Sequence, residues 1–192
     1  MKLSIEPYLK YKLLNSVFLG ISVGSIFTVY GSLDPEIFSY GGIALALLTV
    51  LIARYYSVIM NERWFYKIIL VVETAPAFML VYFLVSPFNY TTALMVYIAY
   101  QLTFIFGSYL ARAETLIFND NEMLRAIDTY KQYGYMFGMG FAIVFYWVAE
   151  FFFGITENKD QVYYIHYVLF AMQLIIIYYF IRAKEGKKVK KS

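Results

Sequence analysis

The sequence has no cysteine and few charged residues. Without cysteine among its 192 residues, the chain cannot form disulfides, thiolate metal sites or a thiol nucleophile. Acidic and basic residues make up only 15% of the chain, whereas soluble domains carry about a quarter. Hydrophobic residues make up 61% and aromatic residues 21%. This composition indicates a membrane protein and argues against a soluble helical bundle.

The few charges fall in clusters that are separated by long apolar runs. The run 74–111 has no acidic or basic side chain, and its length suits two spans, because one helix needs roughly 20 residues to cross the hydrocarbon. Reading from cluster to cluster predicts an all-α, polytopic membrane protein. We expect six transmembrane helices near 12–32, 38–60, 64–86, 91–118, 130–154 and 162–184.

Lysine and arginine lie almost entirely on one side of these predicted spans. Of the 16 basic residues, only Lys159 falls on the opposite side. Because basic residues near span ends stay in the cytoplasm, we expect both termini there. The predicted order is an N-terminal segment 1–11, a bundle 12–184 and a basic tail 185–192. The start does not resemble a cleaved signal peptide, so we expect the first span to be retained.

We therefore expect a multi-pass protein of a cell membrane, such as a bacterial inner membrane. The lipid bilayer is its first partner, and the net charge of +3 follows from topology and indicates no nucleic-acid partner. Small residues on two spans predict close helix crossings, because they let backbones approach in lipid. These residues are Ser16, Gly20 and Gly24 on the first span and Gly134 and Gly138 on the fifth.

The fourth predicted span carries a polar stripe within an apolar run. Steps of 3, 4 and 7 residues keep its members on one helical face. We expect this face to point into the bundle, toward water, a ligand or another chain. The stripe consists of Tyr97, Gln101, Ser108, Arg112, Thr115 and Asn119.

Several ionisable residues fall within or near the spans, where an unpaired charge costs several kcal/mol. Glu114 leaves its helix about 200° from Arg112, so we expect Arg112 to pair elsewhere, with Glu73 as the first candidate and Asp128 as the second. Asp128 also lies one turn before Lys131. Two interpretations stay open for these groups: buried ion pairs that only fix helix register, or proton-coupling sites.

No catalytic constellation is present in the sequence. It has no nucleotide-binding glycine loop, no paired-histidine metal helix and no serine–histidine–aspartate set, so we expect no enzyme activity, no cofactor and no metal site. The single histidine, His166, is better explained as a satisfied interfacial residue than as a proton relay.

The order of these features resembles the amino-terminal six-helix half of a major facilitator superfamily transporter. The stretch 106–115, FGSYLARAET, looks like the fourth span of drug-efflux-type members, and 131–138, KQYGYMFG, looks like the charged entry to the fifth. The link 53–63 departs from the family, because only the basic character of its glycine-rich aspartate–arginine motif is kept. By this resemblance, the substrate-facing side chains are Asn15, Ser22, Gln101 and Arg112.

The resemblance also implies a second six-helix unit, because the family has twelve spans around a central cavity. The leading hypothesis is a half-size transporter that works as a homodimer or with a six-span sister subunit and moves a small polar or anionic solute. The second hypothesis is a non-transporting membrane subunit or assembly factor. A third is a lipid-handling enzyme that uses Arg112, Glu114, Asp120 and Asp128.

Overall fold

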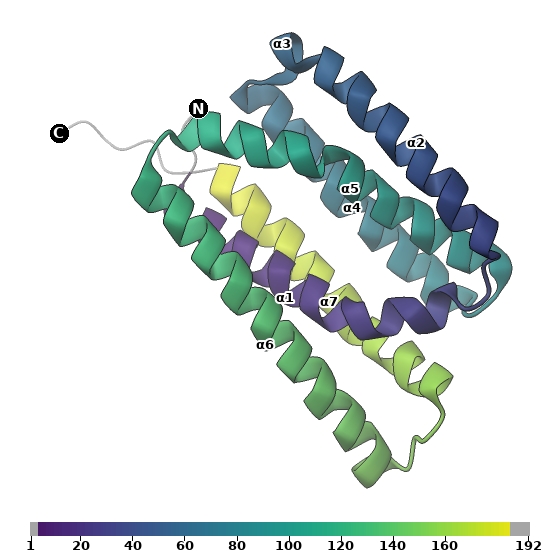
Figure 1. The fold of residues 1–192 in the computed structure, drawn as a ribbon. Helices are drawn as coiled ribbons and strands as arrows, with labels where there is room; N and C mark the ends of the chain where they lie inside the picture. The colour runs from purple at the N-terminus through teal and green to yellow at the C-terminus, as the bar shows by residue number, and fades with distance from the viewer. Residues whose placement is uncertain (1–3, 185–192) are drawn as a thin grey trace.

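The computed structural model describes residues 4–184, and within this range the chain is helical with no strand. Six helices are long and apolar enough to cross a membrane, which confirms the predicted fold class (Figure 1). They are α1 (Ile5–Tyr30), α2 (Pro35–Arg54), α4 (Glu62–Val85), α5 (Tyr90–Phe118), α6 (Asn121–Phe153) and α7 (Asn158–Lys184). A short helix, α3 (Tyr56–Ile59), separates α2 from α4.

Two helices begin well before their predicted spans. α1 starts at Ile5, so residues 5–11 belong to the bundle and not to a separate N-terminal segment. α6 starts at Asn121, where Asp120 caps the helix by accepting a hydrogen bond of 3.0 Å from the Glu122 N–H. These first turns carry charges and extend past the apolar stretch on which the spans were predicted. The predicted basic tail, 185–192, lies outside the described residues.

The second predicted span, 38–60, is shorter in the structure. α2 ends at Arg54, and the backbone of Tyr55 leaves the helical conformation before α3 begins. Tyr109 of α5 stabilises the end of α3, because its hydroxyl donates a hydrogen bond of 2.8 Å to the carbonyl of Ile59.

The six long helices form two groups of three. α1, α6 and α7 make one group, and α2, α4 and α5 make the other (Figure 1). The groups meet chiefly where α4 packs on α7, with a smaller contact between α1 and α5. Exchanging α1 with α5, α2 with α6 and α4 with α7 reproduces the extensive helix contacts, whereas the small contacts of α6 with α5 and α7 have no counterpart of similar size. The first three and last three long helices therefore occupy equivalent positions.

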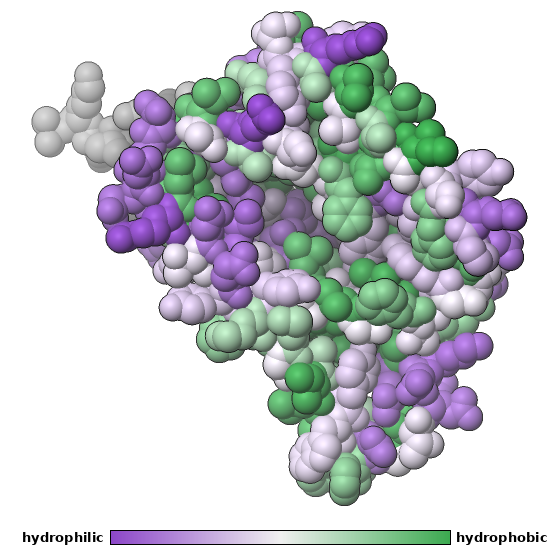
Figure 2. Space-filling model, viewed as in Figure 1, coloured by the Kyte–Doolittle hydropathy of each residue, from purple (hydrophilic) through white to green (hydrophobic). Residues whose placement is uncertain are grey.

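The outer helices of both groups expose many large apolar side chains. α2 has no buried residue and packs mainly on α5. α6 buries Met123 and Ile127 near its N-terminal end and otherwise only glycine and alanine. Phe27, Phe78 and Ile143 are each more than 70% exposed. In Figure 2, hydrophilic side chains gather at the end where α5 meets α6 and at the far end of the molecule, and hydrophobic ones cover much of the surface between. Such a band suits contact with lipid.

Both ends of the described chain lie at the same end of the bundle. The Ser4 N–H donates a hydrogen bond of 3.0 Å to the carbonyl of Ala183, so the start of α1 lies beside the end of α7 (Figure 1). An even number of spans requires this arrangement.

The predicted close crossing of the first and fifth spans is confirmed between α1 and α6. A Cβ added to Gly138 would lie 3.0 Å from Gly20 Cα and closer still to the carbonyl of Val17. One at Gly134 would lie 2.9 Å from Ser16 Cβ. Gly24 differs, because a Cβ there meets only Tyr146 at an ordinary distance of 3.7 Å. The backbones of α1 and α6 touch because these positions lack side chains.

We expect Gly138→Ala to destabilise the protein by about 1–3 kcal/mol, because the new methyl group presses on the α1 backbone, which cannot move aside as a flexible side chain can. Thermal unfolding in detergent measures the effect. Gly140→Ala is the matched control, because a Cβ at Gly140 has no neighbour within 4 Å. Equal melting temperatures for the two variants would contradict the close crossing.

Candidate functional site

One face of α1 carries polar side chains into the interior of the bundle. Tyr8, Tyr11, Lys12 and Asn15 are three, one and three residues apart in turn, which keeps all four on one side of the helix. Tyr8 is fully buried and Tyr11 is 3% exposed. These four side chains reach two acidic groups, one on α4 and one on α5.

The first acidic group, Glu73, lies midway along α4 and is 2% exposed. Its Oε1 accepts hydrogen bonds from the Tyr11 hydroxyl at 2.7 Å and from Asn15 Nδ2 at 2.9 Å. Its Oε2 accepts one of 3.0 Å from Gln173 Nε2 on α7, which also donates to the Glu73 carbonyl at 2.8 Å. Three neutral donors on two other helices therefore hold this carboxyl group.

No basic group of the described residues forms an ion pair with Glu73. The charge of Lys12 acts on it electrostatically, but the Lys12 ammonium is paired with Glu114. Hydrogen bonds to a charged acceptor contribute about 1.5–3 kcal/mol each, so the three donors offset a large part of the cost of burying the carboxyl group. Because none of these donors carries a positive charge, they also permit protonation of the Glu73 carboxyl group.

The second acidic group, Glu114, lies near the C-terminal end of α5 and is 5% exposed. Its Oε1 accepts a short hydrogen bond from the Tyr8 hydroxyl and forms an ion pair with the Lys12 ammonium. The side chains of Lys12 and Glu114 are 12% and 7% exposed. This pair joins α1 to α5 where the two helix groups come together.

An aromatic cluster fixes the two tyrosine hydroxyls in place. The Tyr8 ring lies 5.2 Å from the ring of Phe118 and 5.6 Å from that of Tyr11. Tyr11 in turn lies 5.2 Å from Phe180 of α7. Rings at these distances pack favourably and restrict rotation, so both hydroxyls stay aimed at the carboxyl groups.

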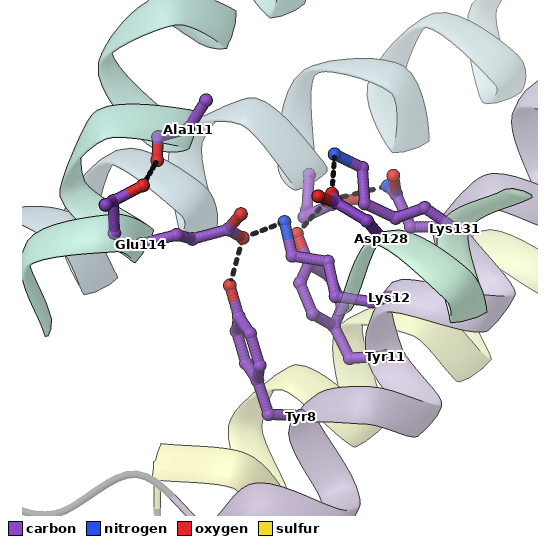
Figure 3. A network of polar contacts seen from close by, with 10 residues as sticks. Tyr8, Tyr11, Lys12, Ala111, Glu114, Asp128 and Lys131 are labelled. Carbon is purple, nitrogen blue, oxygen red and sulfur yellow. Dashed lines mark hydrogen bonds and ion pairs between the residues drawn. The ribbon is translucent and has the colours of Figure 1, made fainter. Parts of the chain in front are cut away.

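Asp128 and Lys131 lie one turn apart on α6. Figure 3 draws them in the same view as the Lys12–Glu114 pair. Lys131 Nζ lies 3.6 Å from Asp128 Oδ1, so the two form an ion pair, but not the buried one that was expected. It is exposed, with 40% of the Lys131 side chain and 75% of the Asp128 side chain accessible.

The expected pairing of Arg112 with Glu73 or Asp128 is not observed. Arg112 is exposed, and its guanidinium lies 6.0 Å above the ring of Tyr56 in α3. Glu73 cannot be its partner because Tyr11, Asn15 and Gln173 already surround that carboxyl group. α5 turns Arg112 away from α1, toward the surface of the chain.

The polar stripe of α5 is split between the interior and the surface. Its C-terminal half, with Ser108, Arg112 and Thr115, is exposed on the single chain and does not point into the bundle. Gln101 is partly buried, and its Oε1 has no hydrogen-bond partner among the described residues. Tyr97 is buried against α2, where it packs on Phe38 and fills the space left by Gly41.

The two α1 residues expected to face substrate are both engaged inside the chain. Asn15 binds Glu73, and Ser22, which is 1% exposed, donates to the Leu19 carbonyl at 2.9 Å. His166 is buried, with Nδ1 2.6 Å from the Val162 carbonyl and its ring stacked on Phe83 at 3.9 Å. It is a satisfied residue, as favoured, although it lies inside the bundle and not at an interface.

Sequence reasoning found the acidic groups but missed their main partners on α1. Tyr8, Tyr11 and Lys12 lie in or beside the stretch that was predicted to precede the bundle. Their spacing from Asn15, at seven, four and three residues, was the signal that could have extended the helix to include them.

The comparisons with known proteins add no relative. No family profile, curated protein or solved structure matches the chain significantly. The function is therefore inferred from the geometry of the site.

We expect Lys12→Met to lower the free energy of unfolding by about 3–5 kcal/mol, because it leaves Glu114 buried without its counter-charge. Chemical denaturation in detergent measures this loss. Lys131→Met is the control, since its exposed ion pair is worth at most about 1 kcal/mol. The double variant Lys12→Met/Glu114→Gln should recover most of the stability, and a failure to recover would contradict the pairing.

Proposed function

We propose that this chain is a half-size transporter of the major facilitator type. Two six-helix units would enclose a central cavity through which a small polar or anionic solute crosses the membrane. Glu73 would bind and release the coupling proton. The ends of the chain would lie in the cytoplasm, because 15 of the 16 basic residues fall on that side of the spans.

The observation that carries the proposal is the environment of Glu73. A buried charged group with a purely structural role is normally paired with an opposite charge, as Glu114 is with Lys12. Glu73 has neutral donors from α1 and α7 instead, at distances of 2.7 to 3.0 Å. Ionisable groups at this depth mark proton or substrate pathways in many membrane proteins. A movement of α1 against α7 would change these donors and with them the proton affinity of Glu73.

The helix arrangement supports the same proposal. The first three long helices and the last three have matching main contacts. Because each set has three spans, the two sets would cross the membrane in opposite directions. Inverted repeats of this kind are common in secondary transporters, where the functional site lies between the repeats. In this chain, Lys12 and Glu114 lie where the α1 and α5 groups meet.

The exposed half of the α5 stripe supports a second unit. Ser108 and Arg112 lie on the surface of the single chain, on a helix that would otherwise present them to lipid. Figure 2 shows the surface hollowed between α5 and α6, with hydrophilic side chains in the hollow. A second copy facing this side would turn the hollow into an enclosed, polar cavity.

One observation favours the second hypothesis, a non-transporting subunit or assembly factor. Glu114 is sealed by Tyr8 and Lys12 within the chain, as a purely structural charge would be. The lipid-handling enzyme receives no such support, because Glu114 is buried with Lys12 while Arg112, Asp120 and Asp128 are exposed. The experiments below separate transport from assembly.

We expect Ser108→Cys to form cross-linked dimers in membranes and to react with a membrane-impermeant maleimide, because the α5 stripe would line a wet cavity between two units. The natural chain has no cysteine, so the label reports one site. Phe78→Cys on α4 is the control, because this position is also exposed but would face lipid. A protein that stays monomeric at high concentration in mild detergent, with Ser108→Cys unreactive, would contradict the proposal.

We expect Glu73→Gln to abolish proton movement coupled to solute, because an amide of the same size cannot bind and release the proton. Proteoliposomes that contain a pH-sensitive dye would be challenged with a panel of small organic anions. Glu122→Gln, at an exposed carboxyl group on α6, should behave as the wild type. Proton movement by Glu73→Gln at the wild-type rate would rule out this role.

A further inference from the structure

A groove of about 1010 Å³ lies between the start of α4 and the end of α7, away from the polar region just described. Its outer part is lined by the basic residues Arg63, Lys67 and Lys184 and by one acidic residue, Glu62. Its deeper part is lined by Leu70, Phe180 and Ile181. The proposed transport cycle uses none of the charged side chains of this groove.

The groove changes from charged to apolar along both helices. On α4, Arg63, Lys67 and Leu70 follow at steps of four and three, so Leu70 lies about 10 Å deeper than Arg63. On α7, Lys184 and Ile181 are one turn apart. Leu70 and Ile181 are each 43% exposed, so the apolar part is open at the side where lipid chains would lie. A phospholipid has the same arrangement, with a charged headgroup at one end and apolar acyl chains at the other.

Tyr66 supplies a polar group that has no partner in the chain. The residue lines the groove and is 5% exposed, and its buried hydroxyl has no hydrogen-bond partner among the described residues. A buried hydroxyl without a partner costs about 1–3 kcal/mol, so a ligand oxygen at this point would be stabilised. Lys67 also lines the groove, and its ammonium lies 4.8 Å from the Trp64 ring centre.

We propose that this groove binds one anionic phospholipid from the membrane. The phosphate lies between Arg63, Lys67 and Lys184 and accepts a hydrogen bond from Tyr66, and an acyl chain lies along Leu70 and Ile181. Basic pockets between helices bind such headgroups by charge, and the apolar floor selects a lipid over a free phosphate ion. The residues after Lys184 contain four lysines against one glutamate, so their charge does not complement the groove.

The binding site is on the α4–α7 side, behind α1 and α5 in Figure 1, and does not rest on the proposed transport function. The test is lipid titration of the full-length protein in neutral detergent, followed by native mass spectrometry. We expect one phosphatidylglycerol to bind much more tightly than phosphatidylcholine with the same chains. Arg63→Gln/Lys67→Gln should weaken this binding about thirtyfold, since each basic residue near the headgroup contributes about 1 kcal/mol.

Arg125→Gln/Lys131→Gln is the matched control, because it removes two exposed charges at the same end of the bundle on α6. It should bind phosphatidylglycerol as the wild type does. Tyr66→Phe should weaken binding severalfold while leaving the thermal stability of the lipid-free protein unchanged or higher, because its hydroxyl has no partner to lose. Equal affinity for the two lipids, or equal weakening in the control and the Arg63/Lys67 variant, would overturn the site.

Discussion

The hydrogen bonds around Glu73 are the constraint on which the rest of the structure depends. A bilayer supplies no water to a carboxyl group midway along a helix, so the chain has to bring donors to it. It does so from α1, with Tyr11 and Asn15, and from α7, with Gln173. These bonds require α1, α4 and α7 to meet at one depth, and the glycine crossing then seats α6 against α1. One buried polar group thus sets the register of three helices, and the glycine crossing adds the fourth.

The two acidic groups solve the same problem in different ways. Glu114 has an ammonium partner, Lys12. The attraction between the two charges depends little on their mutual orientation, so small helix movements preserve it. Glu73 depends on directional hydrogen bonds, which weaken steeply when donors move or turn. A shift of α1 would therefore disturb Glu73 more than Glu114. Lys12 and Tyr11 are neighbours on α1, so the same shift acts on both groups together.

The sequence was sufficient to predict the number and order of the spans, because apolar length is a local property that one helix displays by itself. It also identified Gly20, Gly134 and Gly138 as crossing points, since small residues matter wherever two helices touch in lipid. It did not predict the partners of Glu73 and Arg112. Partners on other helices depend on how each helix is rotated about its axis, and hydropathy in a uniformly apolar run does not specify that rotation.

That rotation also explains why the α5 stripe ends on the surface. Glu114 and Arg112 leave the helix in nearly opposite directions, so only one of them can face α1. The Lys12–Glu114 pair and the Tyr109 contact with α3 fix which one it is. Burying Glu114 therefore directs Arg112 outward, together with Ser108 and Thr115 at one-turn intervals. The internal ion pair and the exposed polar face are two consequences of a single helix orientation.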